Sequence, residues 1–141
     1  MPVSPWFYTN MRGYRKNWVW QGDSLWYDRW NHIFYLQPEY VQILSWNDFG
    51  ESHYIGPLDS NQFTAFDSAH GQSPYVYAKD MPHDGWRATL PYVIEMYKNN
   101  QSTITQEKLV VWYRRSSVLA ACDSGGTTGN TAAKCKFPTD Y

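Results

Sequence analysis

Two amphipathic helical patterns alternate with three apolar runs of strand length, and this order limits the possible folds more than any other feature of the sequence. The apolar runs are residues 2–9 (PVSPWFYT), 40–46 (YVQILSW) and 108–115 (KLVVWYRR). Strands that alternate with helices form parallel sheets with helical crossovers, and such sheets are covered on both faces. The order therefore predicts an α/β fold.

The two helical patterns have recognisable signals at their ends. Asp23 or Ser24 is the expected N-cap of the first helix, and Pro38 follows its last residues. Asp84 is the expected N-cap of the second helix, which forms despite Pro91. Apolar residues recur at helical spacing on one face of each helix. They are Trp26, Trp30, Ile33 and Phe34 in the first, and Trp86, Leu90, Val93, Ile94 and Tyr97 in the second.

Residues 10–17 and 56–84 are expected to be loops, because glycine and polar residues are frequent in them. The second loop is longer than compact domains normally contain without a use for it. Three strands and two helices are too few for a closed (β/α)8 barrel, which typically needs about 250 residues. Residues 1–115 are therefore expected to be the C-terminal portion of a larger domain whose remainder is missing. Residues 116–141 are expected to be a Gly/Ser/Thr-rich extension.

The extension contains the two cysteines of the chain, Cys122 and Cys135. In an exported protein they would close a small disulfide loop, and in a cytosolic protein they would be two idle thiols. Neither cysteine has a partner at the spacing of a zinc site, so no metal site is expected there.

Charge and hydropathy argue against two classes of partner. Twelve Lys and Arg residues are balanced by 13 Asp and Glu residues, so the chain lacks the basic excess that nucleic-acid binding demands. The sequence has no stretch of about 18 apolar residues, and its first residues do not follow the pattern of a signal peptide. We therefore expect neither a nucleic-acid partner nor a membrane partner.

Aromatic residues make up 18% of the chain, with eight Trp, 12 Tyr and six Phe. Most single rings are expected to fill the core. An excess of Trp and Tyr also suits sugars, because a ring face stacks on the apolar face of a pyranose while its polar edge bonds the hydroxyls.

The run WNDFGESHYIGP, residues 46–57, directly follows the second apolar run and places acidic groups among aromatic rings. The segment from Asn47 to Gly50 has the residue types of a tight turn, so Asp48 and Glu51 are expected to project into one cleft. Two carboxylates in different environments can share general acid/base work, as in glycoside hydrolysis. A D-x-x-E pair is also common as a turn residue and a solvated acid. With His53, the pair has the residue types of a metal site, which the aromatic setting favours less.

The chain resembles the C-terminal half of the catalytic domain of glycoside hydrolase family 71, the fungal α-1,3-glucanases or mutanases. The resemblance covers most of residues 2–115 and rests on SPWFYTN, KNWVWQGDSLWYDRW, LQPEYVQILSWNDFGESHYIGPL and LVVWYRR. It implies a (β/α)8 TIM barrel that hydrolyses α-1,3-glucan internally without a cofactor, in a protein located outside the cell or in the cell wall. It also implies that Asp48 and Glu51 are catalytic.

The same resemblance places further residues in the cleft. Trp46, Asn47, His53 and Tyr54 would line it, and Trp6 and Tyr8 are candidates for sugar stacking. Glu51 is expected to be the proton donor, because Phe49, Tyr54 and Trp46 are expected to desolvate it and raise its pKa.

One departure from the family limits this expectation. The earlier strands and a further essential aspartate, which the family places on its N-terminal half, have no counterpart in the chain. We therefore expect the chain itself to be inactive or impaired as an enzyme. Two other interpretations remain open, a carbohydrate-binding module without turnover and a non-functional fragment.

Overall fold

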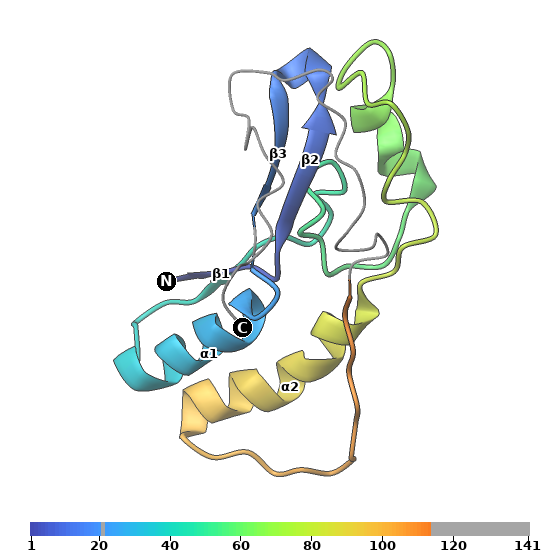
Figure 1. Ribbon diagram of the computed structural model, residues 1–141. Coiled ribbons are helices and arrows are strands. Elements are labelled where there is room, and N and C mark those ends of the chain that lie inside the picture. Colours follow the sequence, from blue (N-terminus) through green and yellow to red (C-terminus); the bar gives the residue numbers. More distant parts are fainter. Residues whose placement is uncertain (21, 114–141) are drawn as a thin grey trace.

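The computed structural model describes residues 1–20 and 22–113 (Figure 1). Its strands are β1 (Pro2–Val3), β2 (Phe7–Met11), β3 (Lys16–Trp20) and β4 (Gln42–Ile43). Its α-helices are α1 (Leu25–Leu36) and α2 (Asp84–Asn99), and two 3-10 helices, η1 (Arg12–Tyr14) and η2 (Ser60–Phe66), lie in connections. This mixture of helices and strands agrees with the predicted class, and the described residues form no closed barrel.

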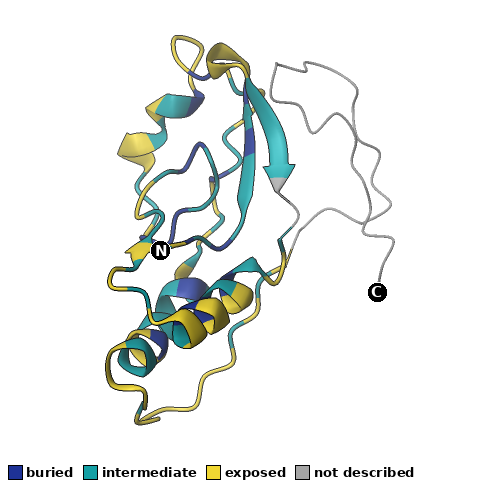
Figure 2. Cartoon of the chain, turned by 90° about the vertical axis from the view of Figure 1, so that its left-hand side faces the viewer, coloured by how far each residue is buried: buried dark blue, intermediate teal, exposed yellow. Residues whose placement is uncertain are grey.

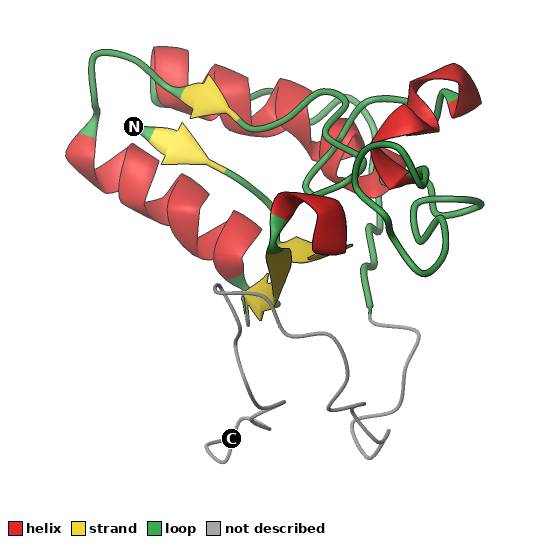
Figure 3. Ribbon diagram, turned by 90° about the horizontal axis from the view of Figure 1, so that it is seen from above, coloured by secondary structure: helices red, strands yellow, loops and turns green. Residues whose placement is uncertain are grey.

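Strands β1 and β4 form a parallel pair, and α1 lies between them in the sequence (Figure 3). Pro2 pairs with Gln42 and Val3 with Ile43. The pairing is far shorter than the predicted strands 2–9 and 40–46. Gln42 is exposed and Ile43 only half-buried, so the expectation of a strand covered on both faces is wrong for β4. Within the described residues, β1 is the one strand that neighbours β4. The other residues of the predicted strand 40–46 therefore have no strand to pair with.

Strands β2 and β3 form an antiparallel hairpin joined by η1 and Arg15, which has a left-handed backbone conformation. The prediction of a loop over residues 10–17 is therefore wrong where it overlaps these strands. Phe7 stacks on Trp18 across the hairpin, with ring centroids 3.9 Å apart. Such cross-strand aromatic packing stabilises a two-stranded ribbon, although the polar residues around the turn resemble a loop.

Both predicted helices are present, side by side in the lower half of Figure 1. Ser24 is the N-cap of α1, and Gln37 ends it in a left-handed conformation. His83, rather than Asp84, is the N-cap of α2, and Pro91 lies inside this helix. The predicted apolar faces point largely inward. Trp26, Trp30, Ile33, Trp86 and Val93 are buried, and Phe34, Leu90 and Tyr97 are partly buried, whereas Ile94 is exposed.

Buried residues gather in two clusters (Figure 2). The first cluster lies between the helices and β1, and its members are Val3, Trp26, Trp30, Ile33, Ile55, Trp86 and Val93. The second comprises Phe49, Tyr54, Phe66 and Ala78. The long loop over residues 56–84 is therefore partly structured, because η2 supplies Phe66 to this second cluster. The run 46–57 contributes to both clusters, so its backbone is anchored on two sides.

The third predicted strand, residues 108–115, is not formed by residues 108–113, and residues 114–115 lie outside the described residues. Trp112 still packs against the first cluster and donates from Nε1 to the carbonyl oxygen of Asp23 at 2.7 Å, whereas Leu109 is 92% exposed. A strand needs a neighbour to complete its ladder, and the described part of the chain offers none at this segment.

The predicted extension 116–141, with Cys122 and Cys135, lies outside the described residues. Among the described helices, neither is sufficiently long and apolar to cross a bilayer.

Candidate active site

The run WNDFGESHYIGP reverses direction because short backbone hydrogen bonds join the residues before and after the turn. Ser45 N donates to the carbonyl oxygen of His53 at 2.9 Å, and Ile55 N donates back to Ser45 O at 2.9 Å. Gly56 N donates to Trp46 O at 2.8 Å. These bonds close residues 47–52 into a compact loop directly after β4, which confirms the predicted reversal.

Asp48 organises the inside of this loop. Its N–H donates to Ser45 Oγ at 3.0 Å, and its Oδ1 accepts from Glu51 N at 3.0 Å. The hydrogen-bonded turn runs from Phe49 to Ser52, with Ser52 N donating to Phe49 O at 3.3 Å, so it begins two residues later than the predicted turn at Asn47. A carboxylate that accepts from a nearby backbone N–H is a common device for tight turns.

Three successive carbonyl groups of the loop are held by donors from other parts of the chain. The hydroxyl of Tyr77 donates to Gly50 O. Tyr8 N donates to Glu51 O at 3.1 Å, and Trp6 Nε1 donates to Ser52 O at 2.8 Å. The path of the loop is therefore fixed by β2, by the segment before it and by the loop that follows η2.

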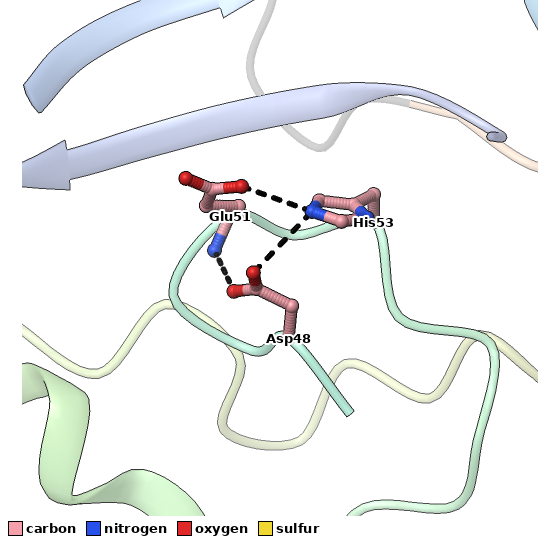
Figure 4. Close-up of side chains that lie close together, drawn as sticks. All are labelled: Asp48, Glu51 and His53. Carbon is pink, nitrogen blue, oxygen red and sulfur yellow. Dashed lines mark hydrogen bonds and ion pairs between the residues drawn. The ribbon is translucent and has the colours of Figure 1, made fainter. Parts of the chain in front are cut away.

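Asp48, Glu51 and His53 come together at this loop (Figure 4). His53 Nε2 lies 3.1 Å from Glu51 Oε2 and 3.5 Å from Asp48 Oδ2. One ligand-type atom from each of the three residues lies within 4.8 Å of the others. On the other side of Glu51, the ammonium of Lys16 from β3 contacts Oε1. Two carboxylates thus face two basic groups in one cluster.

The charges of this cluster are coupled. The hydrogen bond to His53 is the largest cause that lowers the pKa of Glu51. Burial opposes it, and the contact with Lys16 adds to it, so that the pKa is about 2. Burial lowers the pKa of His53, but its contacts with Asp48 and Glu51 outweigh burial and raise the pKa to about 9. At neutral pH, Glu51 is therefore a carboxylate and His53 an imidazolium.

This result corrects the expected raised pKa of Glu51, from which its proton-donor role was predicted. Of the three residues expected to desolvate Glu51, Phe49 is buried in the second cluster and Trp46 is 59% exposed. The immediate neighbours of the carboxylate are cationic, and opposite charges favour the ionised form more strongly than partial burial disfavours it.

Three residues expected to contact sugar make ring contacts within the protein. Tyr54 is 1% exposed, its ring stacks on His83 with centroids 3.8 Å apart, and its hydroxyl donates to Met81 O. It therefore does not line an open cleft. The indole of Trp6 meets Trp86 edge-on at 4.6 Å, and Tyr8 meets Tyr77 edge-on at 4.9 Å, so these rings are also in contact with protein.

Trp46 and Asn47 are the predicted cleft residues that remain exposed. The guanidinium of Arg87 lies 5.9 Å from the centre of the Trp46 ring, within the range of a cation–π contact. Asn47 Nδ2 donates to Gln62 Oε1 at 2.6 Å. Both residues stand immediately before Asp48 in the sequence, and their exposed side chains contact α2 and η2.

Asp48, Glu51 and His53 have the residue types of a metal site and lie close enough together to share an ion. Lys16 and protonated His53 already supply positive charge to the same carboxylates. A divalent cation would have to displace both, so the arrangement suits a charge-compensated pair of acids better than a metal centre.

The sequence alone did not indicate Lys16 or His83. Lys16 lies 35 residues from Glu51 and reaches it only because β2 and β3 form a hairpin. His83 packs among Trp6, Tyr54 and Trp86, and its Nδ1–H donates to the carbonyl oxygen of Tyr54 at 2.9 Å. Burial lowers the pKa of His83 to about 4, so it is neutral at neutral pH.

Comparisons with known proteins agree with the predicted family. Residues 1–140 match the sequence model of glycosyl hydrolase family 71. A mutanase of Penicillium rubens is 42% identical over 132 residues, which are 92% of this chain and 26% of the mutanase. A glucan endo-1,3-alpha-glucosidase of Schizosaccharomyces pombe is 41% identical over 127 residues, which are 87% of this chain and 28% of that protein.

An ascus wall endo-1,3-alpha-glucanase of the same yeast is 35% identical over 127 residues, which are 86% of this chain and 28% of that protein. The chain thus spans roughly a quarter of the length of the curated relatives that it matches. No solved structure matches the chain.

Proposed function

Because the chain belongs to glycosyl hydrolase family 71, we propose that it supplies the carboxylates Asp48 and Glu51 for the hydrolysis of α-1,3-glucan. The observation that carries the proposal is the meeting of Asp48, Glu51 and His53 directly after a parallel strand. Sites of α/β enzymes collect at the carboxyl ends of such strands. The printed names of the relatives, a mutanase and two endo-1,3-α-glucan hydrolases, support the substrate.

The two carboxylates have different roles in this proposal. Glu51 is the ionised member, because both of its oxygens contact cationic groups. Its negative charge stabilises the positive charge that develops on the sugar ring. Asp48 exchanges the proton with the glycosidic oxygen, because its side chain is more accessible to a bound substrate. The side chain of Asp48 is 42% exposed, whereas that of Glu51 is 18% exposed. His53 contacts both carboxylates and holds their side chains in position.

The separation of the pair bears on the mechanism. Inverting enzymes hold their two carboxyl groups about 6.5 to 9.5 Å apart to admit a water molecule between them, and retaining enzymes about 5 to 5.5 Å. Oxygens of Asp48 and Glu51 lie within 4.8 Å, with His53 Nε2 in contact with both side chains. These oxygens are closer together than in either range. In the proposed hydrolysis a water molecule attacks the anomeric carbon, and the glycosidic oxygen leaves with the proton from Asp48. An attacking water between these two groups would have to displace His53.

We also infer that the fold is part of a (β/α)8 barrel. Strand β1, helix α1 and strand β4 form a parallel unit with a helical crossover, and the β2–β3 hairpin is inserted between β1 and α1. Residues 108–113 keep the alternation of a strand, with Trp112 half-buried and Leu109, Val111 and Tyr113 exposed. They would complete a ladder if further strands were present.

The proposed substrate is an insoluble wall polymer, so the proposed location is outside the cell or in the cell wall. The relative named for the ascus wall supports this location. Activity is expected of a complete catalytic domain that contains this chain, because the chain alone spans about a quarter of its relatives.

The decisive experiment replaces each carboxylate in such a complete domain. Asp48→Asn should abolish hydrolysis of the natural glucan but spare substrates with a good leaving group, because these need little protonation. Glu51→Gln should abolish hydrolysis of both kinds of substrate, since each reaction needs the ionised carboxylate to stabilise the positive charge on the sugar ring. Glu39→Gln, which alters an exposed acid before β4, is the matched control and should be fully active. Unchanged hydrolysis by Glu51→Gln would overturn the proposal.

A binding function is the second candidate, and the exposed ring of Trp46 favours it. A Trp that is 59% exposed beside polar groups offers a stacking surface for sugar. Retention of the chain on insoluble α-1,3-glucan, measured beside sugar release, separates binding from hydrolysis. Trp46→Ala should reduce retention, whereas Tyr35→Ala, which removes an exposed ring from α1, should leave it unchanged.

A further inference from the structure

We infer that Lys16 is a positioning residue that fixes the orientation of the Glu51 carboxylate from the β2–β3 hairpin. This inference rests on the proposed role of Glu51. Sequence patterns around the carboxylates do not include Lys16, since the two residues are 35 positions apart.

The hairpin holds Glu51 at two points. Tyr8 N, on β2, donates to the backbone carbonyl oxygen of Glu51 at 3.1 Å. Lys16 Nζ, at the start of β3, donates to Oε1 of the same residue. Met11 pairs with Lys16 in the last rung beside η1, so the position of the ammonium is set by the register of the strands.

The two oxygens of Glu51 also have different partners. Lys16 contacts Oε1 and His53 contacts Oε2, so rotation of the carboxylate about its last bond would break both contacts. Charge-assisted hydrogen bonds of this kind are about twice as strong as neutral ones. Lys16 therefore does more than neutralise charge, because the contacts with Lys16 and His53 together restrain the plane of the carboxylate.

Among the described residues, few charged or titratable groups face Glu51. Asp48 and His53 belong to its own loop, Lys16 comes from β3, and Tyr77 comes from the loop after η2, with its hydroxyl on Gly50 O. With both basic groups protonated, Lys16 and His53 each place a positive charge against the ionised Glu51. Removal of Lys16 takes away one of these positive charges, which favours proton uptake by Glu51.

The test is a carbon-detected NMR titration of the Glu51 side chain in this chain, which requires no catalytic activity. Lys16→Met keeps the length of the side chain but removes its charge, and should raise the titration midpoint of Glu51 by about one pH unit or more. Lys16→Arg should restore most of the wild-type midpoint. Lys79→Met, which removes an exposed lysine elsewhere, is the matched control and should leave the midpoint unchanged.

If Lys16 had only a structural role, Lys16→Met would change the free energy of unfolding without raising the titration midpoint of Glu51. An unchanged midpoint in Lys16→Met, with the amide spectrum of the hairpin intact, would overturn the inference. In a complete catalytic domain, Lys16→Met should also move the acidic limb of the pH profile of kcat/KM to higher pH, because that limb reports the ionisation of Glu51. The NMR result stands even where hydrolysis fails, so the two proposals fail separately.

A second inference concerns modification of the chain. We propose that Asn100 is an N-glycosylation site, carried by the triplet Asn100-Gln101-Ser102, the single N-x-S/T triplet of the sequence. It rests on the proposed extracellular location, since such modification occurs in the secretory pathway.

The structure places this triplet where a glycan can be accommodated. Asn100 is exposed and ends α2 in a left-handed conformation, with φ of 55°. Its backbone N–H donates to Met96 O at 2.9 Å. The hydroxyl of Ser102 donates to Glu95 Oε2 at 2.9 Å. In Figure 1 this end of α2 lies at the bottom of the molecule, away from the β2–β3 hairpin and the site.

The reaction transfers an oligosaccharide from a lipid-linked diphosphate donor. A bond forms between Asn100 Nδ2 and C1 of the first sugar, the bond from C1 to the diphosphate oxygen breaks, and the amide loses one proton. The lipid diphosphate is the leaving group. The glycan adds a polar cover to an exposed helix end and requires no change in the fold.

The test targets the chain to the secretory pathway of a yeast host and follows its gel mobility with and without a glycosidase specific for N-linked glycans. The wild type should show one sensitive species. Asn100→Gln and Ser102→Ala should lose it, Ser102→Thr should keep it, and Asn99→Gln is the adjacent matched control that should keep it. A wild type without this species, or a species that survives Asn100→Gln, would overturn the proposal. Neither result depends on hydrolytic activity.

Discussion

The imidazole of His53 lies nearly parallel to the ring of Phe7, with centroids 5.7 Å apart and 16° between the planes. Phe7 is itself stacked on Trp18 across the hairpin. The imidazole therefore meets carboxylates at one edge and an aromatic face on one side. Because an aromatic face attracts cations, this stack favours the protonated form of His53.

Replacement of Phe7 by Leu should lower the pKa of His53 from its value of about 9. Leucine fills much of the same space but has no π face, and a cation–π contact of about 0.5 to 1 kcal/mol corresponds to roughly half a pH unit. NMR titration of the imidazole would measure the shift. Phe63→Leu, in the packing around the second cluster, should leave the titration unchanged. An equal shift in both variants would contradict the role of the Phe7 face.

Stability should fall on both sides of pH 6.5, for two different histidines. The pKa of His53 is raised to about 9, so its contribution is present below pH 6.5 and is lost as the pH rises toward 9. The pKa of His83 is lowered to about 4 by burial, so stability is lost as the pH falls from 6.5 toward 4. Each effect is on the order of 2 kcal/mol.

Urea unfolding of the chain at a series of pH values would measure both slopes. His53→Gln should flatten the slope above pH 6.5 and keep the one below, whereas His83→Gln should do the reverse. Identical pH profiles for the two variants would show that these histidines are not the source.

Tyr77→Phe should lower the free energy of unfolding by about 2 kcal/mol, because it leaves polar groups of the loop without partners. The hydroxyl of Tyr77 donates to Gly50 O and accepts from Asn10 N at 3.2 Å, so one group ties the loop of residues 47–52 to β2. Tyr92→Phe removes an exposed hydroxyl from α2 as the control. Thermal and urea unfolding should separate the two variants, and equal stability would argue against this tie.

Gly71→Ala should destabilise the contact between the hairpin and the loop after η2 by about 1 to 3 kcal/mol. A Cβ atom at residue 71 would lie 1.9 Å from the carbonyl oxygen of Ala65, so the backbone must move. The same glycine accepts a hydrogen bond from Gly13 N at 2.9 Å, which joins the tip of the hairpin to this loop. Hydrogen exchange at Gly13 N should quicken in the variant. Ser68→Ala, at an exposed position of the same loop, should leave exchange unchanged.

The helices were predictable because their signals are local. Ser24 and Pro38 flank α1, and the apolar spacing of each helix is visible within four turns. The β2–β3 hairpin was not predictable from the same information. Its turn is η1 followed by Arg15, which has a left-handed backbone conformation. Arginine rarely adopts this conformation, so its presence in the sequence does not predict a turn. Strand length also depends on neighbours, and β4 ends after two residues for that reason.

The site was predictable only in part. Asp48, Glu51 and His53 are near one another in sequence, and the turn chemistry between them is local, so their meeting follows from the motif. Burial could not be deduced from residue type. Tyr54 and Trp46 belong to the same run of aromatic residues, yet Tyr54 is buried and Trp46 is exposed. The charge of Glu51 depends on Lys16, whose approach is a property of the folded hairpin.

The three bound carbonyls of Gly50, Glu51 and Ser52 have a practical consequence for protein engineering. Their donors, Tyr77, Tyr8 and Trp6, belong to segments on either side of the motif in the sequence. Transplanting residues 46–57 into a foreign host would carry the acids but leave those oxygens to water, and the shape of the loop would be lost. A minimal portable unit would have to begin before Trp6 and extend past Tyr77.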